Sequence, residues 1–334
     1  MGPPAAPPSI PPADVGTAGF AGARGRLPAE PAAVESFAEF LALHGDSTTK
    51  VARMVRGFFA NGGRRAFVAG AIGALEAVDG IGLLCPRPED SAEAIAQCER
   101  RGDRVALLSL PPGLETVDAA LAAKPAQASA FAAVHHPWLR LDGQITPPGG
   151  HVAGLYASTA PARVPSQAAV AGLDDPPLER EFTQDEIAQL AAAAVNPLRT
   201  IAGAVRLWGA RTLSDDPDWR YVPVRRYALY VEASLDAGLQ WVVFEPNGEA
   251  LWQQMRLAVG DFLVNEWRSG ALQGTKPEDA FFVKCDRTTM TQNDLDNGRL
   301  VCLVGLAVVK PAEFVILRIG SLTASASGPG RVRV

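Results

Sequence analysis

Few residues of this chain have both the type and the spacing that metal or acid–base chemistry requires. The sequence holds four histidines, and none of them stands in the HxxxH or HExxH spacing that places two ligands on one helix face. His135 and His136 precede a Pro-Trp pair, which favours a packed loop over a pair of ligands. His151 follows a Pro-Pro-Gly-Gly turn, where a structural hydrogen bond is the simpler interpretation. The histidines therefore predict no metal site, and we expect no cofactor.

Signatures of a catalytic nucleophile are also missing. Cys85 follows a predicted strand, but Pro86 prevents a helix from starting there and lowering the pKa of the thiol. No GxSxG or GxxxxGK[ST] motif occurs. Glycines at every third position from Gly16 to Gly25 loosely match a dinucleotide loop, yet they lack the preceding strand and following helix that such a loop needs. We expect no enzyme, and the alternative is an α/β hydrolase or nucleotide-binding enzyme built on residues 78–110.

The stretch WGARTLSDDPDWRYVPVRR, residues 208–226, mixes arginine, aromatic and acidic residues as many ligand sites do. A net charge of −5, with acids and bases interspersed, argues against a dedicated nucleic-acid binder, which needs a basic surface. The three aspartates of the stretch are typical of a solvated turn. Binding of a small molecule, chemistry, or contact with another protein chain remain open.

Hydrophobic periodicity predicts the elements that position these residues. Helices are expected within residues 34–45, 50–63, 89–102, 183–194, 225–238 and 247–270, the last of them capped by Asn247 and ended by Gly270. Strands are expected within residues 64–71, 80–86, 103–111, 239–247, 280–286, 299–309 and 312–320. This order predicts an α+β protein with a C-terminal mixed or antiparallel sheet and packed helices. A smaller N-terminal and middle α/β domain with parallel pairing and extended terminal arms complete the prediction.

Length and composition add broad limits. A chain of 334 residues usually folds as two domains. No run of 18 apolar residues occurs, and the N-terminus lacks the basic and apolar regions of a secretory signal. We therefore expect the chain to be made and kept in the cytoplasm. The four cysteines show no CxxC spacing and are expected to be reduced core residues.

Five blocks in a fixed order carry a resemblance to a known family. They are VNPLRTIAGAVRLWGARTLS (195–214), WRYVPVRRYALYVEASL (219–235), QWVVFEPNGEALW (240–252), FLVNEWRSGALQGTKPEDAFFVKCD (262–286) and PAEFVILRIG (311–320). Together they resemble the C-terminal domain of contractile tail sheath proteins of phage tails and phage-derived injection systems. Weaker likeness in GTAGFAGARGR, VRGFFANGGRRAFV and HHPWLRL extends the resemblance over residues 15–320.

The resemblance implies a structural subunit that polymerises around an inner tube and contracts to drive the tube through a target envelope. It implies four parts: a proline-rich N-terminal arm (1–20), an N-terminal and middle α/β domain (21–194), a C-terminal sheath domain (195–320) and a tail (321–334). The partners would be copies of the chain itself, the inner tube protein, and baseplate and cap proteins. Neither nucleic acid nor direct membrane insertion is implied. The chain would assemble in the cytoplasm as part of a phage tail or tail-like injection particle.

The resemblance also suggests where subunits meet. Linkage between subunits is expected from Glu313, Phe314, Val315, Ile316, Leu317, Arg318 and Ile319; the alternative, less favoured, is that Phe314, Ile316 and Ile319 only complete the domain's own sheet. Contacts with the inner tube or a neighbour are expected from Arg211, Arg225, Arg226, Gln253, Arg256 and Arg268. For Arg225 and Arg226, flanking the start of a helix is an equal alternative.

Two departures from the family pattern are visible. The family usually begins with a tyrosine-rich strand that pairs with a neighbouring subunit, whereas this chain has GPPAAPPSIPPAD, whose prolines cannot donate to a sheet. After GLYASTAPAR the chain continues with VPSQAAVAGL in place of the family's tryptophan-containing segment. A divergent sheath paralogue, or a sheath-like adaptor that does not polymerise, is consistent with both departures.

Overall fold

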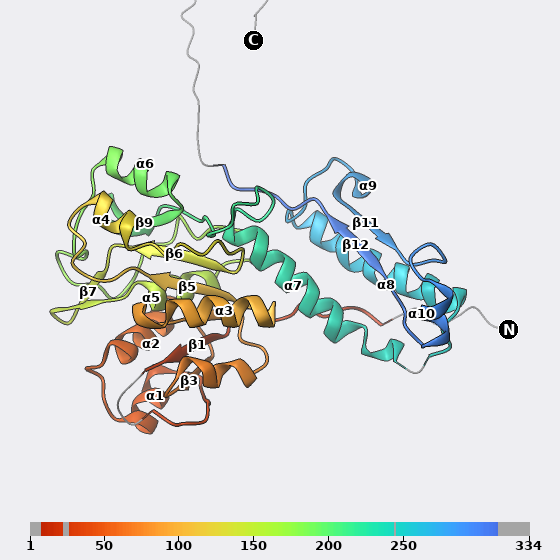
Figure 1. Cartoon of the computed structure of the whole chain (residues 1–334), viewed down its shortest axis with the longest axis horizontal. Helices are drawn as coiled ribbons and strands as arrows, with labels where there is room; N and C mark the ends of the chain where they lie inside the picture. The colour runs from red at the N-terminus through yellow and green to blue at the C-terminus, as the bar shows by residue number, and fades with distance from the viewer. Residues whose placement is uncertain (1–7, 23–26, 244, 313–334) are drawn as a thin grey trace, which may run out of the picture.

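An eight-stranded sheet formed by strands between residues 18 and 207 lies on the left in Figure 1. The computed structural model describes residues 8–22, 27–243 and 245–312. The strand order is β10-β9-β6-β5-β4-β1-β3-β2, with parallel pairing from β9 to β3 and antiparallel pairing at the edge strands β10 and β2. The strands are β1 (Ala18–Ala21), β2 (Ala32–Val34), β3 (Ala66–Ala69), β4 (Leu83–Cys85), β5 (Val105–Ser109), β6 (Ala132–His136), β9 (Val195–Ile201) and β10 (Ala204–Leu207).

Helices cover both faces of this sheet, because its central strands are apolar on both sides. In β5 every residue is buried, with Val105 and Leu107 in the core on one face and Ala106 and Leu108 in the core on the other. The first core includes residues of α1 (Phe37–His44), α2 (Lys50–Ala60) and α5 (Gly149–Ala157), and the second includes residues of α3 (Ser91–Arg101), α4 (Val117–Ala122) and α6 (Gln184–Ala192). The smaller elements are the 3-10 helices η1 (Ile72–Ala77) and η2 (Pro88–Asp90) and a hairpin of β7 (Leu139–Leu141) and β8 (Gln144–Thr146).

Glycines allow α2 and α5 to approach backbone to backbone. A Cβ atom at Gly150 would lie 2.1 Å from the carbonyl oxygen of Met54, and one at Gly154 would lie 2.4 Å from that of Phe58. On α2, a Cβ atom at Gly57 would lie 2.3 Å from the His151 ring. The contact between the two helices therefore requires the absence of three side chains.

In the C-terminal unit, the long helix α8 (Glu249–Arg268) packs against a small sheet, and the long helix α7 (Val222–Gly238) shares its core (Figure 1). The other elements of the unit are η3 (Gln240–Val242), α9 (Pro277–Ala280), β11 (Phe281–Lys284), α10 (Gln292–Asp296) and β12 (Leu303–Leu306). The strands β11 and β12 pair antiparallel. Helix α7 joins this unit to the large sheet, since Val222 and Leu229 belong to a core of the sheet and Tyr227 and Val231 to the core of the unit. Helix α8 buries an apolar stripe at helical spacing, which consists of Trp252, Met255, Val259, Phe262 and Leu263.

The N-terminal segment packs along α7 (Figure 1). Ile10 and Val15 are buried in the core of the C-terminal unit, and Ile10 lies against Gly238 at the end of α7. The backbone N–H of Ala13 donates to Ser234 Oγ at 2.9 Å. From residue 8 onward, the proline-rich segment is therefore part of the packed molecule.

The α+β class is confirmed, but the proportions differ from those expected. The larger sheet lies in the N-terminal and middle part, which was expected to be the smaller. It also includes β9 and β10, although the predicted boundary between residues 194 and 195 assigns them to the C-terminal domain. The reason is that β9 pairs with β6 and buries Val195 and Leu198 in the two cores of the sheet.

Two local predictions are wrong. In place of a strand within residues 239–247, the structure has the 3-10 helix η3, because Leu239, Trp241 and Val242 pack against the core of the C-terminal unit at the end of α7. The predicted N-cap Asn247 is replaced by Gly248. Asn247 instead accepts a hydrogen bond from the Trp252 indole through its Oδ1 atom at 2.8 Å.

Candidate interaction surfaces

Two aromatic rings hold Arg225 inside the chain. Its guanidinium carbon lies 3.5 Å from the centre of the Trp219 ring and 4.1 Å from that of Phe131. Burial lowers the pKa of this guanidinium, and stacking between ring faces offsets part of the cost of removing it from water. The stack ties the first turn of α7 to the loop that precedes β6.

Arg226 is also internal, with 2% of its surface exposed. Its Nη2 atom donates to the carbonyl oxygen of Tyr156 at 2.9 Å, and its guanidinium lies 5.0 Å from the centre of the Tyr156 ring. Burial lowers the pKa of Arg226 to about 10. The predicted contacts of Arg225 and Arg226 with a neighbouring subunit are therefore corrected, because both side chains are engaged within the chain.

Arg211 is bonded to two other parts of the chain, a placement that its sequence pattern did not predict. Its Nη1 atom donates to the carbonyl oxygen of Ala192 at 3.3 Å, and its backbone N–H donates to Asn196 Oδ1 at 2.6 Å. The buried Asn196 side chain also donates to the carbonyl oxygens of Val134 and Arg211, at 3.0 and 2.8 Å. Asn196 thus fixes the segment after β10 against β6. This role could not be predicted from the sequence, where Asn196 is a single asparagine before a proline.

The outward surface of α8 is a row of exposed residues at helical spacing. We call it the α8 face, and it consists of Gln253, Leu257, Asp261, Asn265 and Arg268. Gln253 and Arg268 are among the predicted contacts, and Leu257 adds an apolar side chain that is 50% exposed. Arg256 is half-buried instead, and it donates to the carbonyl oxygen of Cys285 and, at 3.1 Å, to Glu249.

The β11–β12 sheet pairs with no further strand of the described residues. Ala307 donates its N–H to the carbonyl oxygen of Ala280, which continues the ladder and sets its alternation. Leu303 and Gly305 therefore bond toward β11, whereas the backbone groups of Val304 and Leu306 point to the open edge of β12. Open edges of this kind are templates for strands of other chains.

The outer surface of the same sheet is apolar. Phe282 is 58% exposed and Leu303 is 49% exposed, whereas most large apolar side chains of this unit are covered. The alternation within AFFVKCD is the sequence signal that separates Phe282 from the inward Phe281 and Val283. The predicted linkage residues 313–319 lie outside the described residues.

The residues suited to chemistry are packed in the interior. His135 and His136 end β6, so the loop predicted for them is wrong, and adjacent strand residues point to opposite faces of the sheet. Burial lowers the pKa of His135, His136 and His151 to about 4, which leaves all three neutral at pH 7. Burial raises the pKa of the Cys85 thiol far above its usual range. The described part of the chain contains no group of three or more side chains arranged to hold a metal ion.

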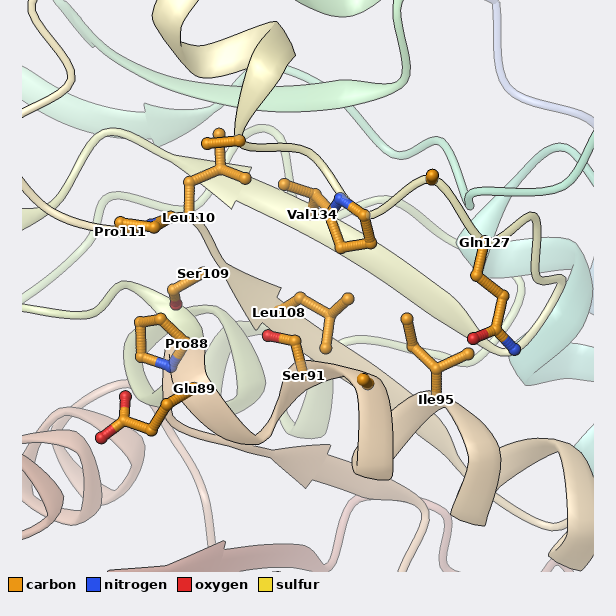
Figure 2. A pocket seen from close by; sticks show the side chains of 14 residues that line it. Pro88, Glu89, Ser91, Ile95, Leu108, Ser109, Leu110, Pro111, Gln127 and Val134 are labelled. Atoms are coloured by element: carbon orange, nitrogen blue, oxygen red, sulfur yellow. The ribbon is translucent and has the colours of Figure 1, made fainter.

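One pocket of about 330 Å³ opens beside the amino end of α3 (Figure 2). It lies in the unit considered for an enzyme, and its polar side chains are Glu89, Ser91, Ser109 and Gln127. Glu89 accepts a hydrogen bond from Arg87 at 2.9 Å. Neither a histidine nor Cys85 belongs to the lining, and the Ser109 hydroxyl has no hydrogen-bond partner among the described residues, so it is not paired with a base that would activate it.

No helix of the described residues is both long and apolar enough to cross a membrane.

Comparisons with known proteins point to one family. The model of the phage tail sheath C-terminal domain matches residues 214–320. A chain of the PVC sheath complex, an extracellular contractile injection system in the contracted state, is 31% identical with a TM-score of 0.85, over 94% of this chain and 93% of that chain. The helical sheath of the anti-feeding prophage (AFP) in the contracted state is 26% identical with a TM-score of 0.79, over 96% of both chains. A chain of the AFP baseplate is 25% identical with a TM-score of 0.81, over 97% of this chain and 98% of that chain. The search of the curated proteins gives no match.

The similarity reaches nearly from end to end of both chains and exceeds 30% identity in the PVC comparison. The family model matches the part of the chain that holds four of the five sequence blocks in whole or nearly so. The chain therefore belongs to the contractile tail sheath family and is a contractile sheath subunit.

Proposed function

We propose that copies of this chain polymerise around an inner tube and that shortening of the polymer drives the tube through a target envelope. The observation that carries the proposal is the nearly full-length similarity to a chain of the PVC sheath complex in the contracted state. Similarity to the AFP helical sheath and to an AFP baseplate chain supports both a helical polymer and contact with a baseplate. In this proposal the chain has a mechanical role without catalysis or cofactor, and the energy is stored in contacts between subunits during assembly.

Subunits are joined, in this proposal, at the open edge of β12. Val304 and Leu306 offer backbone donors and acceptors there, and a neighbour's strand can add to them. The donor segment is residues 313–319 of another copy. Exposed Phe282 and Leu303 provide apolar surface beside the new strand.

The positions of the chain ends support links to more than one neighbour. Ile10 lies against Gly238 at the carboxyl end of α7, while Lys310 Nζ lies 3.0 Å from the carboxylate of Asp218, just before the amino end. Helix α7 has 17 residues and is therefore about 25 Å long. The first and last described residues therefore lie near opposite ends of this helix.

The α8 face is the proposed contact with the inner tube or with an adjacent subunit. It combines exposed polar groups of Gln253, Asp261 and Arg268 with the apolar side chain of Leu257. Arg256 has a different role in this proposal, because its bond to the carbonyl oxygen of Cys285 ties α8 to the residue that follows β11.

Proline substitutions test the linkage. Val304→Pro removes an N–H that points to the open edge, whereas Leu303→Pro removes one that bonds to β11. We expect Val304→Pro to fold but to form no cylinders when co-expressed with the inner tube protein, as seen by negative-stain electron microscopy. Val304→Ala, the matched control, should assemble, and Leu303→Pro should lower the unfolding temperature.

A folded Val304→Pro protein that still forms cylinders would show that linkage does not use the β12 edge. Val283→Pro then tests the β11 edge, because its N–H also points away from the ladder. Cylinders from the folded double variant would contradict linkage through this sheet altogether.

A further inference from the structure

We propose that Cys285 and Cys302 form a cross-strand disulfide when the protein meets a low-molecular-weight disulfide, and that this bond closes the end of the β11–β12 ladder. Both cysteines are free thiols in the structure.

The register of the ladder places the two cysteines opposite each other. Lys284 and Leu303 are the last pair of the ladder, and continuing its register by one residue puts Cys285 opposite Cys302. The alternation set by Ala307 and Ala280 makes this a non-hydrogen-bonded pair, in which opposite Cα atoms approach to about 4.5 Å. That separation lies within the range that a disulfide bridges.

The side chains also point the same way. Cys285 follows the inward residues Phe281 and Val283, and Cys302 precedes the inward Val304. The two thiols lie close enough for each to influence the pKa of the other. Both side chains therefore lie on one face of the sheet, as a cross-strand disulfide requires. Cys85 and Cys98, by contrast, belong to cores on opposite faces of the large sheet.

The reaction is thiol–disulfide exchange, and its atoms balance. Cys302 is half-buried and Cys285 is fully buried, so Cys302 attacks first. Its sulfur bonds to one sulfur of oxidised glutathione, the glutathione S–S bond breaks, and one reduced glutathione leaves with the proton from Cys302. Cys285 then attacks the sulfur of Cys302, and the second reduced glutathione leaves with the proton from Cys285. Burial raises the pKa of both thiols, so exchange is slow at neutral pH and faster in alkaline solution.

The bond would close residues 286–301, with α10 among them, into a covalent loop. The ladder could then no longer open from this end under load. Formation of the bond does not depend on the proposed linkage. Its mechanical consequence rests on that linkage, because it assumes that a neighbour's strand pulls on this sheet.

The test uses the reduced full-length chain incubated with oxidised glutathione, followed by blocking of free thiols and tryptic digestion without reductant. Trypsin cuts after Lys284, Arg287, Arg299 and Arg318, so mass spectrometry should find fragment 285–287 joined to fragment 300–318. This species should vanish on reduction and in Cys302→Ser, while Cys285→Ser should carry one glutathione on Cys302. The oxidised wild-type protein should unfold several degrees higher than the reduced protein.

The proposal is overturned if both fragments carry blocked free thiols after prolonged incubation at alkaline pH, or if wild-type protein carries only glutathione adducts. It is also overturned if Cys302 pairs with Cys85 or Cys98. Assembly is scored separately with the inner tube protein. A disulfide that forms in a chain unable to make cylinders would support the bond and reject the linkage.

Discussion

The contact between α2 and α5 predicts opposite effects of one substitution at two helical glycines. In Gly150→Ala, the new methyl group would lie 2.1 Å from the carbonyl oxygen of Met54, whereas ordinary van der Waals contact begins at 3.4 Å. The helices would have to separate by about 1 Å, and the obstacle is backbone, which cannot rotate away. Overpacking of this kind costs about 1–3 kcal/mol, and the upper end applies to a rigid contact. Alanine recovers about 1 kcal/mol through its higher helix propensity, so the free energy of unfolding should fall by about 2 kcal/mol.

Gly260→Ala is the matched control, because Gly260 lies within α8 and a Cβ atom there meets nothing within 4 Å. The free energy of unfolding should rise by about 0.5–1 kcal/mol. The assay is urea unfolding of the isolated subunit, followed by circular dichroism. An unchanged or raised midpoint for Gly150→Ala would refute the close packing of α2 and α5, and a lowered midpoint for Gly260→Ala would refute the open surface at α8.

Two further predictions concern buried ionisable side chains. Because burial lowers the pKa of His135 and His151 from 6.5 to about 4, the unfolded chain binds more protons than the folded chain between these values. The free energy of unfolding should stay constant above pH 6.5 and fall as the pH drops toward 4, by on the order of 3 kcal/mol for each histidine. Urea midpoints that stay constant between pH 6.5 and 4 would contradict the lowered pKa of these histidines. Trp219→Ala uncovers one side of Arg225 and should cost about 2 kcal/mol, whereas Trp219→Phe should retain most of the stability. Equal midpoints for Trp219→Ala and wild type would show that the stack contributes nothing.

Strong local signals made much of the fold predictable. The helix over Phe37–His44 has Ser36 as its N-cap and Gly45 as its left-handed stop, and the long apolar stripe of α8 leaves little choice of structure. The strand predicted within residues 239–247 was wrong. The apolar pattern of these residues suits a strand, but packing at the end of α7 determines their structure. The sequence also did not predict that β9 belongs to the large sheet, because β9 pairs with β6, which is far away in the sequence.

Surface and interior arginines looked alike in the sequence. Arg225 and Arg226 had the composition of a partner site, but their burial depends on Phe131, Trp219 and Tyr156, which only the fold brings near. The open edge of β12 could not be predicted from the sequence either, because whether a strand is an edge depends on which other strands pair with it. The family could be predicted from the resemblance of the sequence blocks, whereas the exposed surfaces could be identified only in the structure.

Negative-stain electron microscopy of this chain co-expressed with its inner tube protein shows directly whether a sheath assembles. We expect striated hollow cylinders from the full chain. We expect none from a chain lacking residues 311–334, whose circular dichroism should still show a folded core. Dispersed subunits from the full chain, or cylinders from the shortened one, would contradict assembly through the C-terminal strand.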